Sequence, residues 1–351
     1  MVGYSMTTGA LLWGPVALTG SNGNFPVPDP YDSIGGYQST IANGVDYLMG
    51  FGGDIWAVNI ATGAILWYTN TNTLSGYAGS DTPYGVWPLW IFSGGSVAGG
   101  VLFLNEGHEY SPPLFRGASE LAINITNGKL VWSSMGFDVT NGAAVSDGIM
   151  TTLNAYDNQI YAYGMGPSKT TVTAPDIGVT TATPITITGT VTDISDGSQQ
   201  QAVAANFPNG LPCVSDASMS AWMEYVYMQQ SMPTNVTGVP VTLTAIDSNG
   251  NTQTLGTAYT NYLGPFGFTW TPNITGNYTV TATFAGTQSY YGSSASTYFY
   301  ASASPATPAP TATPVTGLAT MSGLTIGFAA AVIAIIIAIA IVGLLIIRKK
   351  P

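Results

Sequence analysis

The residues best suited to bind a metal ion lie at 106–110, where the only histidine of the chain, His108, stands between Glu106 and Glu109. Imidazole and carboxylate groups are ligands of transition metals. Adjacent residues of one loop rarely converge on a single ion, however, and such sites usually contain further imidazole or thiolate ligands. We therefore interpret this segment as a solvated loop between strands.

Three acidic segments raise the question of calcium binding. Residues 247–251 (DSNGN) resemble a Ca²⁺ loop, but no glutamate follows at the distance needed for a bidentate ligand. This segment lies between two expected strands, and turns are also favoured at residues 29–32 and 193–196. The sequence thus predicts no catalytic, cofactor-binding or metal-binding residue.

Aromatic residues are the better candidates for contact with a ligand. Trp87 and Trp90, in the sequence WPLWIF, could stack on a sugar or a peptide, because aromatic side chains often anchor binding sites. Aromatic side chains also fill the gaps between packed sheets, and we favour this second interpretation.

Asn-x-Thr triplets mark possible N-glycosylation sites, which matter only if the chain is extracellular. They begin at Asn124, Asn235, Asn273 and Asn277. Asn124 falls in an expected hairpin and is sterically poor, so Asn273 and Asn277 are the better candidates.

The charge balance excludes two classes of partner. The chain has 17 acidic and six basic residues, and three of the basic residues lie in the last four positions. So acidic a surface repels nucleic acid and anionic lipid. Cys213 is the only cysteine, so no intrachain disulfide can form and stability must come from packing.

Three segments of the first half align without gaps: GYSMTTGALLW at 3–13, AVNIATGAILW at 57–67 and AINITNGKLVW at 122–132. Each predicts a hairpin in which a glycine supplies positive φ at the turn and the second strand ends on a tryptophan. The glycines are Gly9, Gly63 and Gly128, and the tryptophans are Trp13, Trp67 and Trp132.

These segments resemble the repeat of quinoprotein-type β-propellers, Ala-x-Asp-x-x-Thr-Gly-x-x-x-Trp. The second copy matches it at Ala57, Thr62, Gly63 and Trp67, with Asn59 in place of Asp. The resemblance implies that residues 1–166 form four-stranded propeller blades and that each tryptophan docks between neighbouring blades. The family includes quinone-dependent dehydrogenases and propellers that only bind protein partners.

About three blades and one additional strand pair can be counted, whereas closed propellers usually have four to eight blades. The last blade is expected to lack its outer strand, and residues 3–13 to be an outer strand without its blade. Either the two ends complete one blade in a four-bladed ring, or further blades precede Met1. We favour the second interpretation, since residues 1–5 do not resemble a signal peptide.

Residues 167–300 alternate polar and apolar side chains over short strands, which predicts an antiparallel sandwich. Residues 276–297 resemble the end of a bacterial-type immunoglobulin-like domain. Within an insertion near 193–237, residues 218–230 predict a short helix capped by Asp216 or Ser218. Its aromatic side chains are expected to pack on the sandwich, with a partner surface as the alternative. With this insertion the chain resembles archaeal membrane-anchored surface proteins of unknown role.

Residues 318–347 predict a transmembrane helix. Residues 324–347 carry no charge and reach about 36 Å as a helix, enough to cross a hydrocarbon core of about 30 Å. Residues 301–317, rich in Pro, Thr and Ala, predict an extended stalk. The basic tip, 348–351, should stay in the cytoplasm, which places nearly all of the chain outside the cell.

We therefore expect an all-β fold: a partial β-propeller of quinoprotein-type repeats, an immunoglobulin-like β-sandwich and one C-terminal transmembrane helix. The expected function is cell-surface binding, adhesion or scaffolding, with an extracellular protein or glycan as partner, no cofactor and no enzymatic activity. The alternatives are a fragment of a membrane-anchored quinoprotein (PQQ-dependent) oxidoreductase and a structural surface-layer component.

Overall fold

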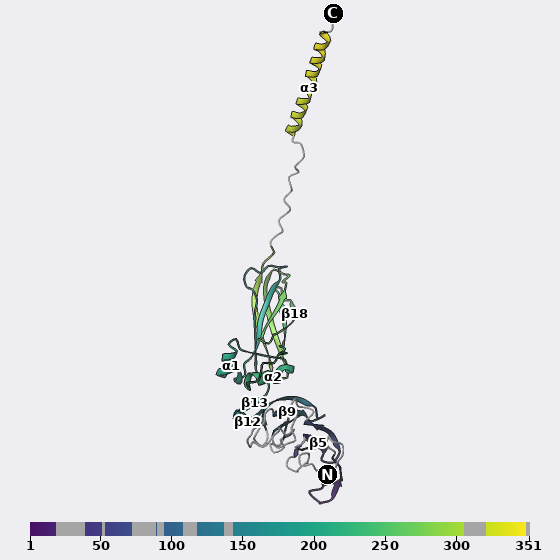
Figure 1. Cartoon of the computed structure of the whole chain (residues 1–351), viewed down its shortest axis with the longest axis vertical. Coiled ribbons are helices and arrows are strands. Elements are labelled where there is room, and N and C mark those ends of the chain that lie inside the picture. Colours follow the sequence, from purple (N-terminus) through teal and green to yellow (C-terminus); the bar gives the residue numbers. More distant parts are fainter. Residues whose placement is uncertain are drawn as a thin grey trace. The chain divides into compact units, whose positions relative to one another are not determined.

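The computed structural model describes residues 1–18, 39–50, 53–71, 89, 95–107, 118–136, 143–304 and 321–348. By their contacts the residues fall into two units, Met1–Ser304 and Pro305–Pro351. In its described part the first unit is built mainly of antiparallel sheets, and the second contributes the helix α3 (Figure 1).

Three consecutive sheets form the blades of a partial propeller. Blade 1 consists of β3 (Ser39–Ala42), β4 (Val45–Met49), β5 (Asp54–Asn59) and β6 (Ile65–Asn70). Blade 2 consists of β7 (Ser96–Ala98), β8 (Val101–Asn105), β9 (Ser119–Asn124) and β10 (Leu130–Met135). Blade 3 consists of β11 (Ala144–Ser146), β12 (Ile149–Asn154) and β13 (Gln159–Tyr163). In each blade, strands that follow one another in the chain are paired, and Figure 1 labels the third strand of each, β5, β9 and β13.

The first two strands of every blade are joined by the same tight turn. Its central residues are Asn43–Gly44 in blade 1, Gly99–Gly100 in blade 2 and Asp147–Gly148 in blade 3, and all six have φ angles between 52° and 82°. Two-residue turns with positive φ at both positions match the twist of the strands that they join. These dipeptides therefore set the register of the inner hairpin of each blade.

Neighbouring blades are joined along their first strands by a repeated hydrogen bond. Thr40 Oγ1, on β3, donates to the carbonyl of Gly95, just before β7, at 2.8 Å. Ser96 Oγ, on β7, donates to the carbonyl of Ala143, just before β11, at 2.6 Å. Farther out, blades 1 and 2 share an apolar core whose buried members include Met49, Ile55, Leu102, Leu104 and Leu121.

The blades confirm the expected fold class, but the predicted strand ends are wrong. β6 continues past Trp67 to Asn70, and β10 past Trp132 to Met135, because each strand pairs along the whole length of its neighbour. The opening pair, β1 (Gly3–Tyr4) and β2 (Leu11–Trp13), forms its own sheet. Within the described residues neither strand pairs with a strand of blade 3.

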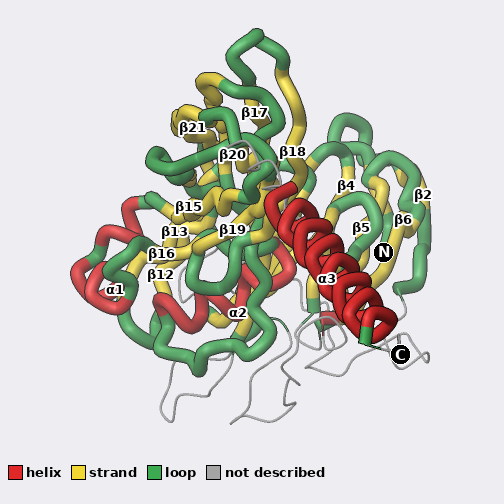
Figure 2. Tube along the Cα trace, turned by 90° about the horizontal axis from the view of Figure 1, so that it is seen from above, coloured by secondary structure: helices red, strands yellow, loops and turns green. Residues whose placement is uncertain are grey.

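Residues after blade 3 form a two-sheet β-sandwich. One sheet contains β14 (Ser168–Thr173), β15 (Ile185–Asp193), β16 (Leu211–Pro212) and β19 (Pro265–Trp270). The other has the order β18 (Thr252–Tyr259), β17 (Pro240–Ile246), β20 (Gly276–Gly286) and β21 (Tyr291–Ala301), and β17, β20 and β21 are labelled in Figure 2. Alternate side chains of both sheets fill one core, among them Ile187, Val191, Val241, Leu243 and Val280.

The two sheets are also joined along one side, where β14 lies beside β21. Ser168 Oγ donates to the carbonyl of Tyr291 at 2.6 Å, and the hydroxyls of Thr170 and Ser293 are 2.7 Å apart. Residues 166 and 290, and residues 180 and 302, form isolated bridges in the parallel sense. The first and last strands of the sandwich therefore run in the same direction.

The insertion between β15 and β17 contains η3 (Asp196–Gln199), α1 (Gln201–Asn206), β16 and α2 (Asp216–Tyr227). α2 begins and ends earlier than predicted, and α1 was not predicted. Neither expected cap forms: Ser215 occupies the N-cap position, and Ser218 Oγ accepts a hydrogen bond from the N–H of Thr237 instead. Trp222 of α2 is buried in a separate small core with Val203, Leu211 and Val214.

The second unit contains α3 (Met321–Ile347), whose 27 residues correspond to a length of about 40 Å. Residues 322–347 form the one described helix that is long and apolar enough to cross a membrane. Its apolar side chains are exposed.

Candidate functional site

The most specific contacts of the propeller join a tryptophan of one sheet to a turn of the next sheet along the chain. Trp13 Nε1, on β2, donates to the carbonyl of Ile60, in the turn after β5, at 2.7 Å. Trp67 Nε1, on β6, donates to the carbonyl of Ile125, in the turn after β9, also at 2.7 Å. We call this turn, with the carbonyl and the glycine that receive the indole, a tryptophan socket.

Glycine is required in an occupied socket for two reasons. Gly63 and Gly128 have φ angles of 71° and 69°, which side chains rarely adopt. A Cβ atom at Gly128 would also lie 2.7 Å from Cε3 of Trp67, and one at Gly63 would overlap the ring of Trp13. The glycine therefore forms the floor on which the indole lies.

The backbone of the socket is held by an asparagine at its start. Asn59 Oδ1 accepts hydrogen bonds from the N–H groups of Ala61 and Thr62 at 3.0 and 3.1 Å, and Asn124 Oδ1 accepts one from Thr126 at 2.8 Å. These are Asx turns, in which an asparagine side chain replaces water as the acceptor of turn N–H groups. Asn59 thus accepts the hydrogen bonds of the turn at the position where the quinoprotein-type repeat has Asp.

Trp132 has no socket to enter, because the chain passes from β13 directly into the sandwich and blade 3 has no fourth strand. Its ring instead stacks on Tyr163, with centroids 5.5 Å apart and planes 20° apart. It also contacts Phe103, which corresponds in position to Tyr47, the contact of Trp67. A tyrosine of blade 3 therefore replaces the missing turn.

The insertion of the sandwich closes this end of the propeller. Glu224, on α2, accepts a hydrogen bond from the N–H of Met135, the last residue of β10, at 2.6 Å. The hydroxyl of Tyr161, on β13, is 3.3 Å from the carbonyl of Tyr227, at the end of α2. The sequence analysis did not find these residues, since contacts between positions 89 and 66 residues apart leave no local signal.

Burial dominates the electrostatics of this junction. Burial raises the pKa of Glu224, which the hydrogen bond from Met135 partly offsets. Burial, followed by the nearby Glu120 carboxylate, raises the pKa of Tyr163, and burial raises that of Tyr227 to about 12. The phenols of Tyr163 and Tyr227 therefore stay protonated at neutral pH.

Asp216, the first residue of α2, bonds the N-terminal end of this helix to the sandwich. Its carboxylate accepts hydrogen bonds from Ser289 Oγ at 2.6 Å and from the N–H groups of Gln288 and Ser289 at 3.1 Å, in the turn between β20 and β21. Partial burial opposes ionisation, but these hydrogen bonds outweigh it and lower the pKa of Asp216. α2 is therefore bonded to the propeller at Glu224 and to the sandwich at Asp216.

Asp216→Asn is expected to destabilise the protein at neutral pH by about 1 kcal/mol, near the low end for hydrogen bonds to charged groups because the carboxylate is exposed. The pKa of Asp216 is lower in the folded protein than its unfolded value of about 3.8, so the ionised carboxylate stabilises the fold above this pH. That stabilisation is lost as the pH falls through the folded pKa. Denaturation of both proteins between pH 2 and 7 should show the difference shrinking below that value. Asp196→Asn, an exposed carboxylate of η3, is the control, and a constant difference would contradict the assignment.

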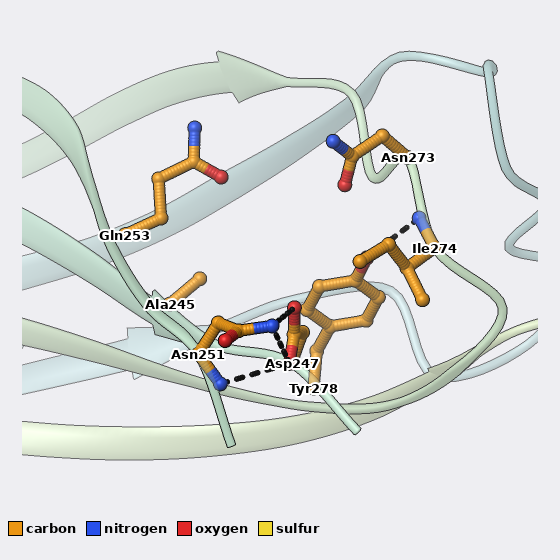
Figure 3. A pocket seen from close by; sticks show the side chains of 7 residues that line it. All are labelled: Ala245, Asp247, Asn251, Gln253, Asn273, Ile274 and Tyr278. Atoms are coloured by element: carbon orange, nitrogen blue, oxygen red, sulfur yellow. Dashed lines mark hydrogen bonds between the residues drawn. The ribbon is translucent and has the colours of Figure 1, made fainter. Parts of the chain in front are cut away.

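A small pocket lies at one end of the sandwich (Figure 3). It has a volume of about 90 Å³ and is lined in part by Asp247, Asn251 and Asn273. Both carboxylate oxygens of Asp247 face Asn251 Nδ2, at 3.3 and 3.0 Å, and this hydrogen bonding lowers the pKa of Asp247. The carboxylate faces N–H donors, and residues 247–251 form the predicted turn. The volume of the pocket suits a few water molecules.

A second hollow, of about 350 Å³, lies beside the insertion. Thr171, Thr190, Thr192 and Asp193 contribute to its lining. The hydroxyls of Thr171 and Thr190 bond each other at 2.7 Å, and Asp193 Oδ1 accepts a hydrogen bond from the N–H of Ser195 at 2.7 Å. These polar groups thus already have protein partners.

The other predicted sites are distributed as follows. Trp87, Trp90, His108, Glu109 and residues 29–32 lie outside the described residues. Glu106 is fully buried rather than solvated, because its N–H bonds the carbonyl of Ser119 and extends the pairing of β8 and β9. In the described part of the chain, no three His, Cys, Asp or Glu side chains could hold one metal ion. Cys213 is buried, and burial raises its thiol pKa.

The four glycosylation candidates differ in accessibility. Asn124 is half-buried and its side chain accepts a hydrogen bond within the socket of Trp67, which makes it a poor acceptor of sugar. Asn235, Asn273 and Asn277 are exposed. Asn277 lies on β20 directly opposite Tyr300 of β21.

Comparisons with known proteins give no family. No family model and no curated protein match the chain. Among solved structures, the quinohemoprotein alcohol dehydrogenase from Comamonas testosteroni is 12% identical, with a TM-score of 0.29 over 54% of this chain and 38% of that one. BamB from Moraxella catarrhalis is 8% identical, with a TM-score of 0.22 over 66% and 68%. The fibronectin(III)-like modules of CbhA from Clostridium thermocellum are 11% identical, with a TM-score of 0.24 over 59% and 87%.

The chain spans 38% of the length of the Comamonas testosteroni dehydrogenase. At these TM-scores the likenesses carry no argument about activity. The partial propeller and the sandwich are instead defined by their strand pairing and by the repeated contacts between blades.

Proposed function

We propose that this chain is a membrane-anchored cell-surface protein whose blades and sandwich form a binding or scaffold surface outside the cell. α3 serves as the anchor, because its length and composition suit a bilayer. Arg348, with the two lysines after it, favours a cytoplasmic C-terminus. The blades and the immunoglobulin-like sandwich are then exposed to the exterior.

The observation that carries this proposal is the double attachment of α2. Glu224 bonds blade 2 and Asp216 bonds the sandwich, so one short helix ties the two modules together. Binding surfaces are most precise when they are built on rigid elements held by supporting contacts. A surface protein that presents blades to a partner benefits from such a connection.

The sandwich presents chemistry suited to an uncharged partner, such as a neutral glycan. On the outer face of β20 and β21, Thr279 lies opposite Tyr298 and Asn277 opposite Tyr300. The two tyrosines are 70% and 54% exposed. Tyrosine, asparagine and hydroxyl side chains together favour adaptable hydrogen bonding and aromatic stacking, as in antibody binding sites.

Protease treatment of intact cells tests the orientation. With different epitope tags at the two ends of the chain, the N-terminal tag should disappear from intact cells while the C-terminal tag persists on a short fragment. A tagged cytoplasmic protein, which should stay intact, is the control for lysis. Protection of the N-terminal tag until the cells are broken would contradict a surface location.

A further inference from the structure

Two buried hydroxyl groups near the end of blade 2 have no hydrogen-bond partner in the described part of the chain. They are Ser134 Oγ, on β10, and the phenol oxygen of Tyr163, on β13. The side chain of Ser134 is 5% exposed. A buried hydroxyl without a partner has lost its hydrogen bonds to water, which costs free energy. Bound ions and ordered water molecules are among the reasons why native proteins contain such groups.

Both hydroxyls lie on the same side of blade 2. Trp132 and Ser134 are two residues apart on β10, so their side chains project from one face. The ring of Tyr163 stacks on Trp132 at this face, with centroids 5.5 Å apart. Glu120, on β9, pairs directly with Ser134 and projects from the same face. Its side chain extends along the face toward Gly136, where an added Cβ would lie 2.7 Å from Glu120 Cγ.

A second carboxylate reaches this place from the insertion. Glu224 Oε1 accepts a hydrogen bond from the N–H of Met135, the residue next to Ser134. Burial first, and then the charges of Glu120 and Glu224, raise the pKa of Tyr163, so both carboxylates lie near its hydroxyl. Neither of them is hydrogen-bonded to it. The oxygens of these side chains are therefore neighbours that are too far apart to bond one another directly.

We propose that Glu120, Ser134, Tyr163 and Glu224 bind one Ca²⁺ ion between blade 2, blade 3 and α2. Two carboxylates balance the charge of a divalent cation, and the two hydroxyls gain the partner that the described protein groups do not supply. Ca²⁺ takes about six to eight oxygen ligands in flexible geometry, whereas Mg²⁺ demands a near-ideal octahedron. Four side chains from separate elements meet the looser requirement, and water completes the coordination.

Water alone is the alternative occupant, since a buried water molecule bridges about two to four polar groups. The charges favour the cation. Two carboxylates that share one buried place repel each other, and a bound cation removes that repulsion while water does not. The propeller repeat does not imply this site, because Glu224 belongs to the insertion of the sandwich. The inference goes beyond the proposed function and does not depend on the orientation of the anchor.

Calcium titration of the full chain in detergent, after metal has been removed with a chelator, tests the site. Ca²⁺ should shift denaturant unfolding to higher denaturant. The ratio of folded to unfolded protein should rise about tenfold when free Ca²⁺ is about ten times its Kd. Mg²⁺ at the same concentration should cause a much smaller shift. Tb³⁺, which replaces Ca²⁺, should luminesce when the aromatic rings are excited, because Trp132 and Tyr163 lie beside the site.

Two substitutions remove a ligand and keep the packing. Glu224→Gln retains an oxygen that can accept the hydrogen bond from Met135 but removes the charge. Its stability without Ca²⁺ should therefore persist, while its affinity for Ca²⁺ should fall about tenfold or more. Tyr163→Phe retains the ring that stacks on Trp132 and removes only the hydroxyl without a described partner. Its affinity for Ca²⁺ should fall severalfold.

Each substitution has a matched control. Asp196→Asn removes an exposed acidic charge from the same insertion, and Tyr161→Phe removes a phenol hydroxyl that donates to Asp157. Both controls should respond to Ca²⁺ as the unmodified chain does. The proposal is overturned if the unmodified chain does not respond to Ca²⁺ or if Mg²⁺ acts equally. It is also overturned if Glu224→Gln or Tyr163→Phe keeps the full response, in which case the two hydroxyls face water.

Discussion

Gly128→Ala is expected to lower the stability of the propeller by about 2–4 kcal/mol. About 1 kcal/mol comes from placing a side chain at a φ of 69°. A further 1–3 kcal/mol, roughly, comes from overpacking, because the added Cβ would lie 2.7 Å from Cε3 of Trp67 and force the indole out of the socket. Denaturant unfolding of the full chain in detergent, followed by tryptophan fluorescence, measures the loss.

Gly148→Ala is the matched control for this substitution. Gly148 has a φ of 79°, but an added Cβ would meet no described atom within 4 Å. Only the backbone cost of about 1 kcal/mol should therefore appear. If both variants lost the same stability, the glycine would serve only the backbone angle, and the packing of Trp67 on Gly128 would contribute little.

Trp222→Ala is expected to cost about 3–5 kcal/mol, the range for deleting a large buried aromatic side chain. Trp222 is 1% exposed and contacts the rings of Phe207 and Tyr225. Its removal empties the small core that holds α2 in place. Hydrogen exchange should then rise across 193–237 and also at Met135, whose N–H depends on Glu224.

Trp222→Phe separates the volume of the side chain from its hydrogen bonding. No described group accepts a hydrogen bond from the buried indole nitrogen of Trp222, so the phenylalanine variant loses volume but no polar contact. We expect a loss of about 1–2 kcal/mol and unchanged exchange at Met135. A loss as large as that of Trp222→Ala would mean that the indole nitrogen has a partner after all.

The sheets of this protein could be predicted because their signals are local. A Thr-Gly or Asn-Gly pair at the turn, a tryptophan four residues later and alternating apolar residues all lie within one hairpin. Gly63 and Gly128 take the positive φ that a tight turn requires. The apolar run of α3 is equally local, since composition alone decides whether a helix suits lipid.

The junction between propeller and sandwich could not be predicted in the same way. Asp216 was expected to cap its own helix, yet its carboxylate bonds residues 72 and 73 positions away. Glu224 reaches 89 residues back to Met135. Such contacts depend on how finished elements meet, and a single sequence carries no periodicity that would reveal them. The burial of Glu106 was missed for the same reason, because pairing of β9 with the end of β8 decides it.

The parallel course of β14 and β21 determines how this protein would respond to tension. The chain enters the sandwich at Gly166, beside Tyr290, and leaves it near Ser302, beside Thr180, so entry and exit lie at opposite ends of the strands. A pull between the blades and α3 therefore acts along β14 and β21. The ladders that join them to β15 and β20 lie across this direction, so their hydrogen bonds are sheared together rather than opened one after another.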